Sequence, residues 1–152
     1  MDAVNRFDTP ATHALVRLEY GIALATCVVL FVVHIGQIHW LPAVLLFVYI
    51  DLVGYLPGAI AHHRAQHDRT QRTRIPKTYY VLYNLMHSFA TQAVVVGAWV
   101  LFAGWQWALL AVPIHLLGDR ALFGNALKPF AVPFEPVAHP AFTRMSRELA
   151  TS

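Results

Sequence analysis

Four long apolar stretches set the strongest limit on what this chain can fold into. They run over about residues 20–38, 41–61, 79–103 and 107–123. As an α-helix, each is close to the roughly 20 residues that cross about 30 Å of hydrocarbon. Charged residues make up only 12% of the chain, against about 25% in soluble proteins, so we exclude a water-soluble fold. The sequence therefore predicts an all-α, integral membrane four-transmembrane-helix bundle over residues 1–128 and a Pro-rich tail over residues 129–152.

The basic residues predict the orientation of this bundle. All eleven Lys and Arg residues lie in the N-terminal segment, in the middle loop around 62–78, or from Arg120 onward. The two tight connections, at 37–41 and 104–106, contain none. The positive-inside rule then puts both termini and the middle loop in the cytoplasm. The formal charge of +3 serves this anchoring, so we expect no nucleic acid partner.

Prolines mark both ends of the chain. Thr9 followed by Pro10 predicts a helix start, with residues 10–19 as a polar extension of the first apolar helix. After Lys128, four prolines interrupt any helix. We therefore expect an extended tail against the membrane face, with a last helical turn near Ser146.

Four side chains of metal-binding type lie deep inside the predicted spans, where a charge at mid-bilayer costs on the order of 2.5–3.5 kcal/mol. They are Asp51, His87, His115 and Asp119. At about 1.5 Å per residue, the first three lie roughly 12–15 Å from the cytoplasmic helix ends, and Asp119 is one turn from His115. Because Cys27 is the only cysteine, a cysteine cluster is excluded. The sequence predicts a divalent metal site, with zinc first and iron or manganese as alternatives.

Two other interpretations of these four residues stay open. In the first, the carboxylates are neutral or pair with Arg120 and the histidines. This network would specify helix packing or relay protons in a non-catalytic membrane subunit. In the second, His87 and His115 are axial ligands of a b-type haem. A small bundle can also form a homo-oligomer, and Gly54 and Gly58 are the clearest small-residue stripe for an interface.

Further polar side chains line the predicted cavity or the loop next to it. They share helix faces with Asp51 and His87, follow Asp119, or begin the histidine-rich middle loop. For the histidine-rich loop, the alternative to a role at the site is attraction of the loop to anionic lipid headgroups. We expect this set to contact a substrate or to support the metal ligands: Tyr55, His62, His63, Arg64, His67, Asn84 and Arg120.

Three motifs carry a resemblance to known families: DLVGYLPG, YNLMHS and HLLGDRALFGNALK. With them, residues 50–130 resemble small bacterial four-helix membrane proteins of unknown function. More distantly, the pair His87–Ser88 and the later His115 and Asp119 look like those of YdjM-type inner-membrane proteins, which are regarded as metal-dependent hydrolases. The chain lacks the Leu-Pro-Asp-x-Asp acid pair of that family.

The second resemblance implies a metal-dependent hydrolase that crosses the bacterial inner membrane several times. Since the site lies within the membrane, we expect membrane lipid as a partner and a lipid-like or amphipathic substrate from the cytoplasmic leaflet. A catalytic metal needs an open coordination position, so we expect Asp51 to act as the base. Ser88 is expected to bind the substrate or, alternatively, to act as nucleophile.

Overall fold

The computed structural model describes residues 10–67, 75–131, 133–135 and 140–150. All regular secondary structure in these ranges is helical, which confirms the all-α prediction. The α-helices are α1 (Pro10–Val33), α2 (Trp40–Gly54), α3 (Leu56–His67), α4 (Lys77–Met86), α5 (Phe89–Ala103), α6 (Ala111–Gly118) and α7 (Pro140–Ala150). Between them lie two 3-10 turns, η1 (Ile35–Gln37) and η2 (Trp107–Leu110), and a π-helical turn, η3 (Asp119–Phe123).

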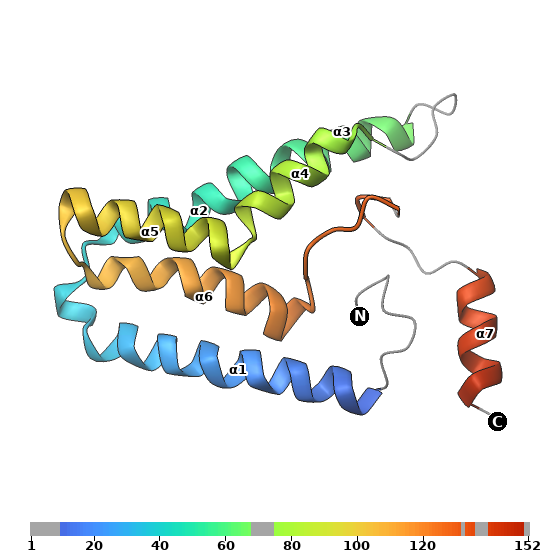
Figure 1. The fold of residues 1–152 in the computed structure, drawn as a ribbon, viewed down its shortest axis with the longest axis horizontal. Helices are drawn as coiled ribbons and strands as arrows, with labels where there is room; N and C mark the ends of the chain where they lie inside the picture. Colours follow the sequence, from blue (N-terminus) through green and yellow to red (C-terminus); the bar gives the residue numbers. More distant parts are fainter. Residues whose placement is uncertain (1–9, 68–74, 132, 136–139, 151–152) are drawn as a thin grey trace.

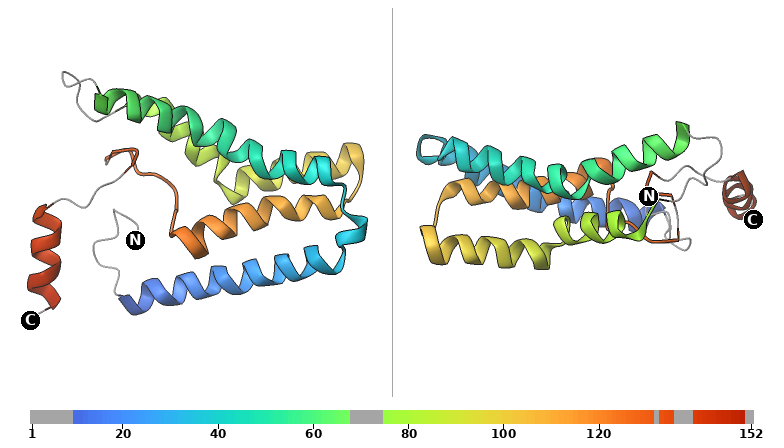
Figure 2. Two further views of the ribbon diagram at one scale, coloured as in Figure 1. Left: turned by 180° about the vertical axis from the view of Figure 1, so that it is seen from behind. Right: turned by 90° about the horizontal axis from the view of Figure 1, so that it is seen from above.

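The helix α6 lies in the middle of the bundle. It packs against α1 on one side and against α2 and α5 on the other (Figure 1). The pair α3 and α4 continues beyond the end of α6, and α7 stands apart from the bundle (Figure 2). The start of α1, the end of α3 and the start of α4 lie at one end, while η1 and the turn after α5 lie at the other.

Two helices are long and apolar enough to cross a membrane. They are Pro10–Val33 and the rod Trp40–His67, which joins α2 to α3; the bent pair of α4 and α5 adds a third if it counts as one span. The outward faces are strongly apolar, since Leu101 and Phe102 are 83% and 91% exposed. Large exposed apolar surfaces of this kind mark contact with lipid or protein. These features indicate a membrane protein.

The first helix ends earlier than predicted. It covers Pro10–Val33, with proline at its first position, and Thr9 lies outside the described residues. Directly after the helix, the His34 ring stacks on Trp107 with ring centroids 3.5 Å apart. The indole N–H of Trp107 also donates a hydrogen bond of 3.2 Å to a side-chain amide oxygen of η1. These contacts hold the chain against η2 and stop the helix.

The second apolar stretch forms one rod with a step, which is the interruption of the α-helix at Tyr55. α2 ends at Gly54, and α3 then runs to His67, past the predicted end of the span. Pro57 explains the step, because proline has no N–H for the carbonyl of Val53 and its ring crowds that carbonyl. The rod therefore carries Asp51 and the histidine-rich segment on one element.

The third stretch is not the continuous helix that the sequence predicts. α4 and α5 meet at an angle of 55° around His87 and Ser88. Carbonyls near the break find side-chain donors: Gln92 Nε2 donates to Met86 at 2.7 Å, and Arg120 donates to His87 at 3.2 Å. Broken backbone at membrane depth is tolerated only where neighbouring groups satisfy it in this way. The bend is therefore a stabilised part of the fold.

The fourth stretch is helical over residues 107–123 but changes helix type twice. η2 leads into α6, and η3 ends at Gly124, which has the left-handed φ of 68°. Arg17 on α1 donates to two carbonyl oxygens of η3 at 2.8 and 2.6 Å. A π-helical turn is frequently found at a functional site, and this one begins at Asp119.

The tail is more structured than the predicted extended segment. Residues 140–150 form an eleven-residue helix in place of a single turn near Ser146. Pro140 accounts for this, because proline at the first helical position favours a helix start. Before α7, Phe134 is fully buried, with its ring 5.4 Å from that of Tyr80. The first part of the tail thus packs on α4.

An apolar core between α2, η2 and α6 holds the bundle together. Ile50 and Leu116 are 0% and 1% exposed, and they pack with the small residues Ala43, Ala108 and Ala111. Small residues at helix contacts allow close backbone approach. Since truncating a buried leucine costs about 2–5 kcal/mol, this core fixes the two helices that carry Asp51 and His115.

Candidate metal centre

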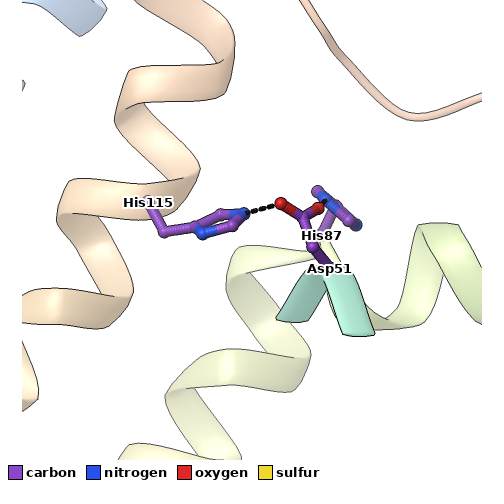
Figure 3. A group of neighbouring side chains, drawn as sticks. All are labelled: Asp51, His87 and His115. Carbon is purple, nitrogen blue, oxygen red and sulfur yellow. Dashed lines mark hydrogen bonds and ion pairs between the residues drawn. The ribbon is translucent and has the colours of Figure 1, made fainter. Parts of the chain in front are cut away.

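Four side chains meet beside the apolar core, and we call them the Asp/His cluster: Asp51 from α2, His87 from the bend, His115 from α6 and Asp119 from η3. Nε2 of His87 lies 3.2 Å from Asp51 and 3.4 Å from Asp119. Nε2 of His115 lies 3.7 Å and 3.6 Å from the same two carboxylates. Figure 3 shows the carboxylate of Asp51 between the two imidazoles. One donor atom from each of these three residues lies within 4.8 Å of the others.

A backbone contact of His87 determines which of its nitrogens is protonated. Nδ1 lies 3.0 Å from the carbonyl oxygen of Tyr83, which can only accept, so Nδ1 carries a proton. In the neutral ring, Nε2 then has a lone pair, which faces the carboxylates of Asp51 and Asp119. A lone pair beside two carboxyl groups is stable where one of them keeps its proton and donates it, or where a cation lies between them. The Nε2 side of His87 therefore calls for a shared proton or a metal ion.

The distances at the two Nε2 atoms give one direct hydrogen bond and leave room for a metal ion. N–H···O hydrogen bonds are about 2.7–3.2 Å long, and only the contact of 3.2 Å between His87 and Asp51 reaches that range. Asp51 faces the two rings with different oxygens, Oδ1 toward His87 and Oδ2 toward His115, and one donor atom from each of the three residues lies within 4.8 Å of the others, close enough to share a metal ion. Both ring nitrogens of His115 are buried and make no hydrogen bond within 3.5 Å, and Nε2 faces the two carboxylates at 3.6 and 3.7 Å. A metal ion could lie between Nε2 and these oxygens.

The Asp/His cluster is closed on the histidine side and open at Asp51. The side chains of His87 and His115 are 5% and 4% exposed, and those of Asp119 and Asp51 are 18% and 51% exposed. In the part of the chain that the structure describes, both carboxylates form ion pairs with these imidazoles alone. The guanidinium of Arg120 lies over the phenyl ring at the start of α5, 4.1 Å from its centroid. A divalent ion would balance the two carboxylates.

Close packing holds the imidazoles in place. Gly54 lets α2 approach the bend, since a Cβ there would lie 2.6 Å from a methionine side chain of α4 and 3.3 Å from His87 Cε1. The ring of Tyr83 stacks on His87 with centroids 3.9 Å apart. Phe47 contacts His115 edge-on, with centroids 4.7 Å apart. In the sequence, only the small-residue stripe with Gly54 and the apolar or aromatic character of the others pointed to these neighbours.

A second cluster, which the sequence did not predict, shares Tyr83 with the first. We call it the lysine box: Lys128, Tyr83, Phe134 and Glu135. Nζ of Lys128 lies 4.8 and 4.4 Å from the ring centroids of Tyr83 and Phe134, donates to the Phe134 carbonyl at 2.6 Å, and pairs with Glu135 at 3.6 Å. Burial lowers the pKa of the Lys128 ammonium, and Glu135 opposes that shift. The cation inside the lysine box is therefore a side chain of the protein, the Lys128 ammonium.

Three of the predicted supporting residues lie at these two clusters. The side-chain amide of Asn84 donates to the Lys128 carbonyl at 2.8 Å and accepts from the Lys128 N–H at 2.6 Å. The Tyr55 ring lies 5.7 Å from Nζ of Lys128. Arg120 bonds the carbonyl of His87. Asn84 and Tyr55 thus support the lysine box, and Arg120 supports the bend.

The histidine-rich segment is not part of the Asp/His cluster. His62 lies about 16 Å along the rod from Asp51, at about 1.5 Å per residue. It is buried and contacts Gln66 at 3.0 Å. The remaining three predicted residues, His63, Arg64 and His67, are exposed on α3, and the rings of the two histidines stack with centroids 5.5 Å apart.

Ser88 lies at the start of α5, directly after His87. It is the N-cap residue, and its hydroxyl makes no capping hydrogen bond. The side chain is half-buried. No capping hydrogen bond therefore holds the Ser88 hydroxyl at the helix end.

Comparisons of this chain with models of known protein families, with curated proteins and with solved structures gave no significant match.

Proposed function

We propose that this chain is an integral membrane protein that binds one divalent metal ion through Asp51, His87 and His115. The spacing of the donor atoms carries the proposal. The Nε2–oxygen distances of 3.2 to 3.7 Å are mostly too long for hydrogen bonds, and one donor atom from each of the three residues lies within 4.8 Å of the others. Three protein ligands with a carboxylate beside them, here Asp119, are also typical of catalytic sites, which keep one position open.

Zinc is the metal that we propose first. Imidazole nitrogen and carboxylate oxygen suit zinc, iron and manganese, and two histidines with one carboxylate form catalytic zinc sites in other proteins. A zinc-binding histidine usually donates its other N–H to a carbonyl or carboxylate, as His87 does to Tyr83. Iron and manganese remain the alternatives.

We further propose four membrane-crossing stretches, with both termini in the cytoplasm of a bacterial inner membrane. The helix α1, the rod of α2 and α3, and the bent pair would supply three, and helical residues 107–123 the fourth. The described basic residues support this orientation, because Arg17 near the start of α1 and Lys77 at the start of α4 belong to the same end of the bundle. The positive-inside rule makes that end cytoplasmic.

The reaction that we propose is metal-dependent hydrolysis of a lipid or another amphipathic substrate. A bound metal ion would polarise the substrate oxygen and make a water molecule acidic near neutral pH. Asp119 would accept the proton from that water, since it contacts both imidazoles. Asp51, expected from the sequence to be the base, would serve as a ligand, and Ser88 would donate a hydrogen bond to the substrate.

The two alternative functions, a b-type haem protein and a non-catalytic membrane subunit, differ in how well they fit the geometry of the Asp/His cluster. A b-type haem between His87 and His115 would have to displace both carboxylates, so the geometry does not favour it. A non-catalytic subunit whose polar network specifies helix packing is favoured by one observation. The hydroxyl of Tyr49 bonds Gln92, which bonds the carbonyl next to His87, so polar contacts continue from the bend into the bundle.

Hydrolysis by metal-loaded protein tests the proposed activity. Purified protein would be assayed in mild detergent with fluorogenic phospholipids, before and after a chelator. We expect turnover to stop with the chelator and to return with zinc. Asp119→Asn should keep the metal and lose about 10²-fold or more in kcat, as for removal of a general base. His39→Ala is the matched control, because His39 is exposed at the far end of the bundle.

The two measured quantities separate the possible failures. Protein that holds zinc in the Asp/His cluster but hydrolyses no phospholipid would contradict the hydrolase and leave the metal-binding role standing. Folded protein that holds no metal would contradict the metal-binding role itself.

A further inference from the structure

The helix α7 separates apolar from polar residues more strongly than any other α-helix that the structure describes. In its sequence, Phe142, Met145 and Leu149 follow one another at steps of three and four residues, which is the spacing of one helix face. The opposite face carries Arg144 and Arg147, and both side chains are exposed. A short amphipathic helix with arginines on its polar face is typical of helices that lie in a membrane surface.

The direction of α7 differs from that of the bundle. In Figure 1 the bundle helices run from side to side, whereas α7 runs from top to bottom, and the view from above in Figure 2 shows α7 nearly end-on. Because the proposed spans follow the direction of the bundle, α7 runs along the plane of the membrane. It also lies at the end of the bundle where Arg17 and Lys77 lie. Both features match a helix in the membrane surface.

A short tether holds α7 near that surface. Phe134 is fully buried against Tyr80, at the start of the third apolar stretch, with ring centroids 5.4 Å apart. The six residue steps from Phe134 to Pro140 span at most about 21 Å. Phe123 and Phe130, which precede this tether, are exposed. The exposed apolar surface of the bundle therefore continues into the segment that carries α7.

Charge and size favour lipid over another protein as the partner of α7. The helix carries Arg144 and Arg147 against one acidic residue, Glu148. The negative surface potential of a cytoplasmic leaflet strengthens binding by about fivefold for each Lys or Arg near it. A standard protein interface uses about 20–30 residues on each side, and the whole of α7 has eleven. Because the tether keeps the helix at the membrane, a small apolar face is sufficient there.

We propose that α7 is an amphipathic anchor that lies in the membrane surface, with its apolar face in the lipid and Arg144 and Arg147 at anionic headgroups. The sequence led us to expect an extended tail against the membrane face. The helix gives that contact a defined apolar face and a preference for charge. The proposal goes beyond metal binding, because no residue of the Asp/His cluster takes part. The competing partners of the apolar face are the bundle itself and a second copy.

Spin labels on the full-length protein test the anchor. Cys27, the single cysteine, would be replaced by alanine, and a nitroxide would be attached at Met145→Cys or, as the matched control, at Thr143→Cys. Thr143 is exposed, and two residues along a helix reach the opposite side. In nanodiscs of phosphatidylcholine and phosphatidylglycerol, power-saturation EPR would compare access of oxygen, which concentrates in lipid, with access of a water-soluble nickel chelate. We expect the oxygen-to-nickel ratio to be at least about threefold higher at residue 145 than at residue 143.

Removing the charges tests the lipid preference. The double change Arg144→Gln and Arg147→Gln should lower the ratio of inserted to water-exposed label at residue 145 by about 25-fold, from about fivefold for each arginine. Nanodiscs of phosphatidylcholine alone should give a similar loss with both arginines present. Lys77→Gln is the control, because it removes an exposed charge at the same end of the bundle and lies outside α7. Zinc content should be the same in all these variants.

Three results would overturn the anchor. Equal access of both reagents at residues 143 and 145 would place α7 in water. A label at residue 145 that neither reagent reaches would place the apolar face against protein. Spin–spin broadening that dilution with unlabelled protein removes would then assign this face to a second copy, and no broadening would assign it to the bundle. Insertion that neutral lipid and the double arginine change leave unaltered would contradict the role of the arginines.

Discussion

The Asp/His cluster and the lysine box share Tyr83, yet they balance charge in different ways. In the lysine box, the chain supplies its own cation, and Lys128 meets a carboxylate, a carbonyl and two aromatic rings. In the Asp/His cluster, two carboxylates face two imidazoles without a Lys or Arg partner among the described residues. The chain thus supplies the cation of the lysine box itself, whereas we propose that a metal ion supplies it in the Asp/His cluster.

This difference leads us to expect a structural role for the lysine box and a binding role for the Asp/His cluster. Lys128 is held through hydrogen bonds to Asn84 and closes the tail onto α4, so its removal should affect stability. The Asp/His cluster has buried nitrogens without a hydrogen bond and an exposed edge at Asp51, so its removal should affect binding. The predictions below follow this contrast.

The largest expected effect is loss of the metal in His115→Ala. One of three ligands disappears, and zinc should fall from about one ion per chain to background in elemental analysis of protein purified without a His-tag. His39→Ala should keep its zinc, since that side chain is exposed at the start of α2. Equal zinc in both variants would remove His115 from the site.

A smaller effect on the metal is expected for Gly54→Ala. The added Cβ would lie 2.6 Å from Met86 and 3.3 Å from His87, so the imidazole must shift. Loss of ligand orientation typically costs 10–100-fold in metal affinity, which a competition titration with a zinc chelator measures. Gly97→Ala is the control, because nothing lies near its Cβ and alanine favours a helix by about 0.5–1 kcal/mol. Unchanged affinity in Gly54→Ala would show that the close approach does not position His87.

Lys128→Met should change stability and leave the metal in place. The variant keeps the apolar stem but loses the ion pair and the hydrogen bond of the ammonium, so we expect a loss of about 1–3 kcal/mol. Equilibrium unfolding in detergent measures it, with zinc content recorded in parallel. Lys77→Met, at an exposed position, should have little effect. Zinc loss in Lys128→Met alone would mean that the two clusters are one functional unit.

The smallest expected effect is that of Ser88→Ala. Its hydroxyl makes no capping hydrogen bond, so stability should change by less than about 0.5 kcal/mol, compared with about 1 kcal/mol for a bonded N-cap. Zinc content should also stay the same. If Ser88 binds substrate, as we propose, only KM for the lipid should rise. A large loss of stability would show that the hydroxyl has a structural role.

The convergence of Asp51, His87 and His115 could be anticipated from the sequence. The apolar stretches set the helices, and the constant rise per residue put the three side chains at one depth. Their role as metal ligands stays a prediction. The spacing of His115 and Asp119 belonged to a single helix and needed no tertiary information.

The bend and the lysine box could not be anticipated, because both depend on distant partners. No proline or glycine marks the break at His87, and its backbone is satisfied by Gln92 and Arg120, the latter from another helix. Asn84 meets Lys128 across 44 residues of sequence. Such contacts follow from the packing of the whole chain and leave no local pattern.

X-ray absorption at the zinc edge, with elemental analysis of the same untagged protein, tests the central claim most directly. The account predicts about one zinc per chain, bound by imidazole nitrogen and carboxylate oxygen at about 2.0–2.2 Å, without sulfur. Folded protein that takes up no stoichiometric zinc, iron or manganese, or a metal without histidine ligands, would contradict it.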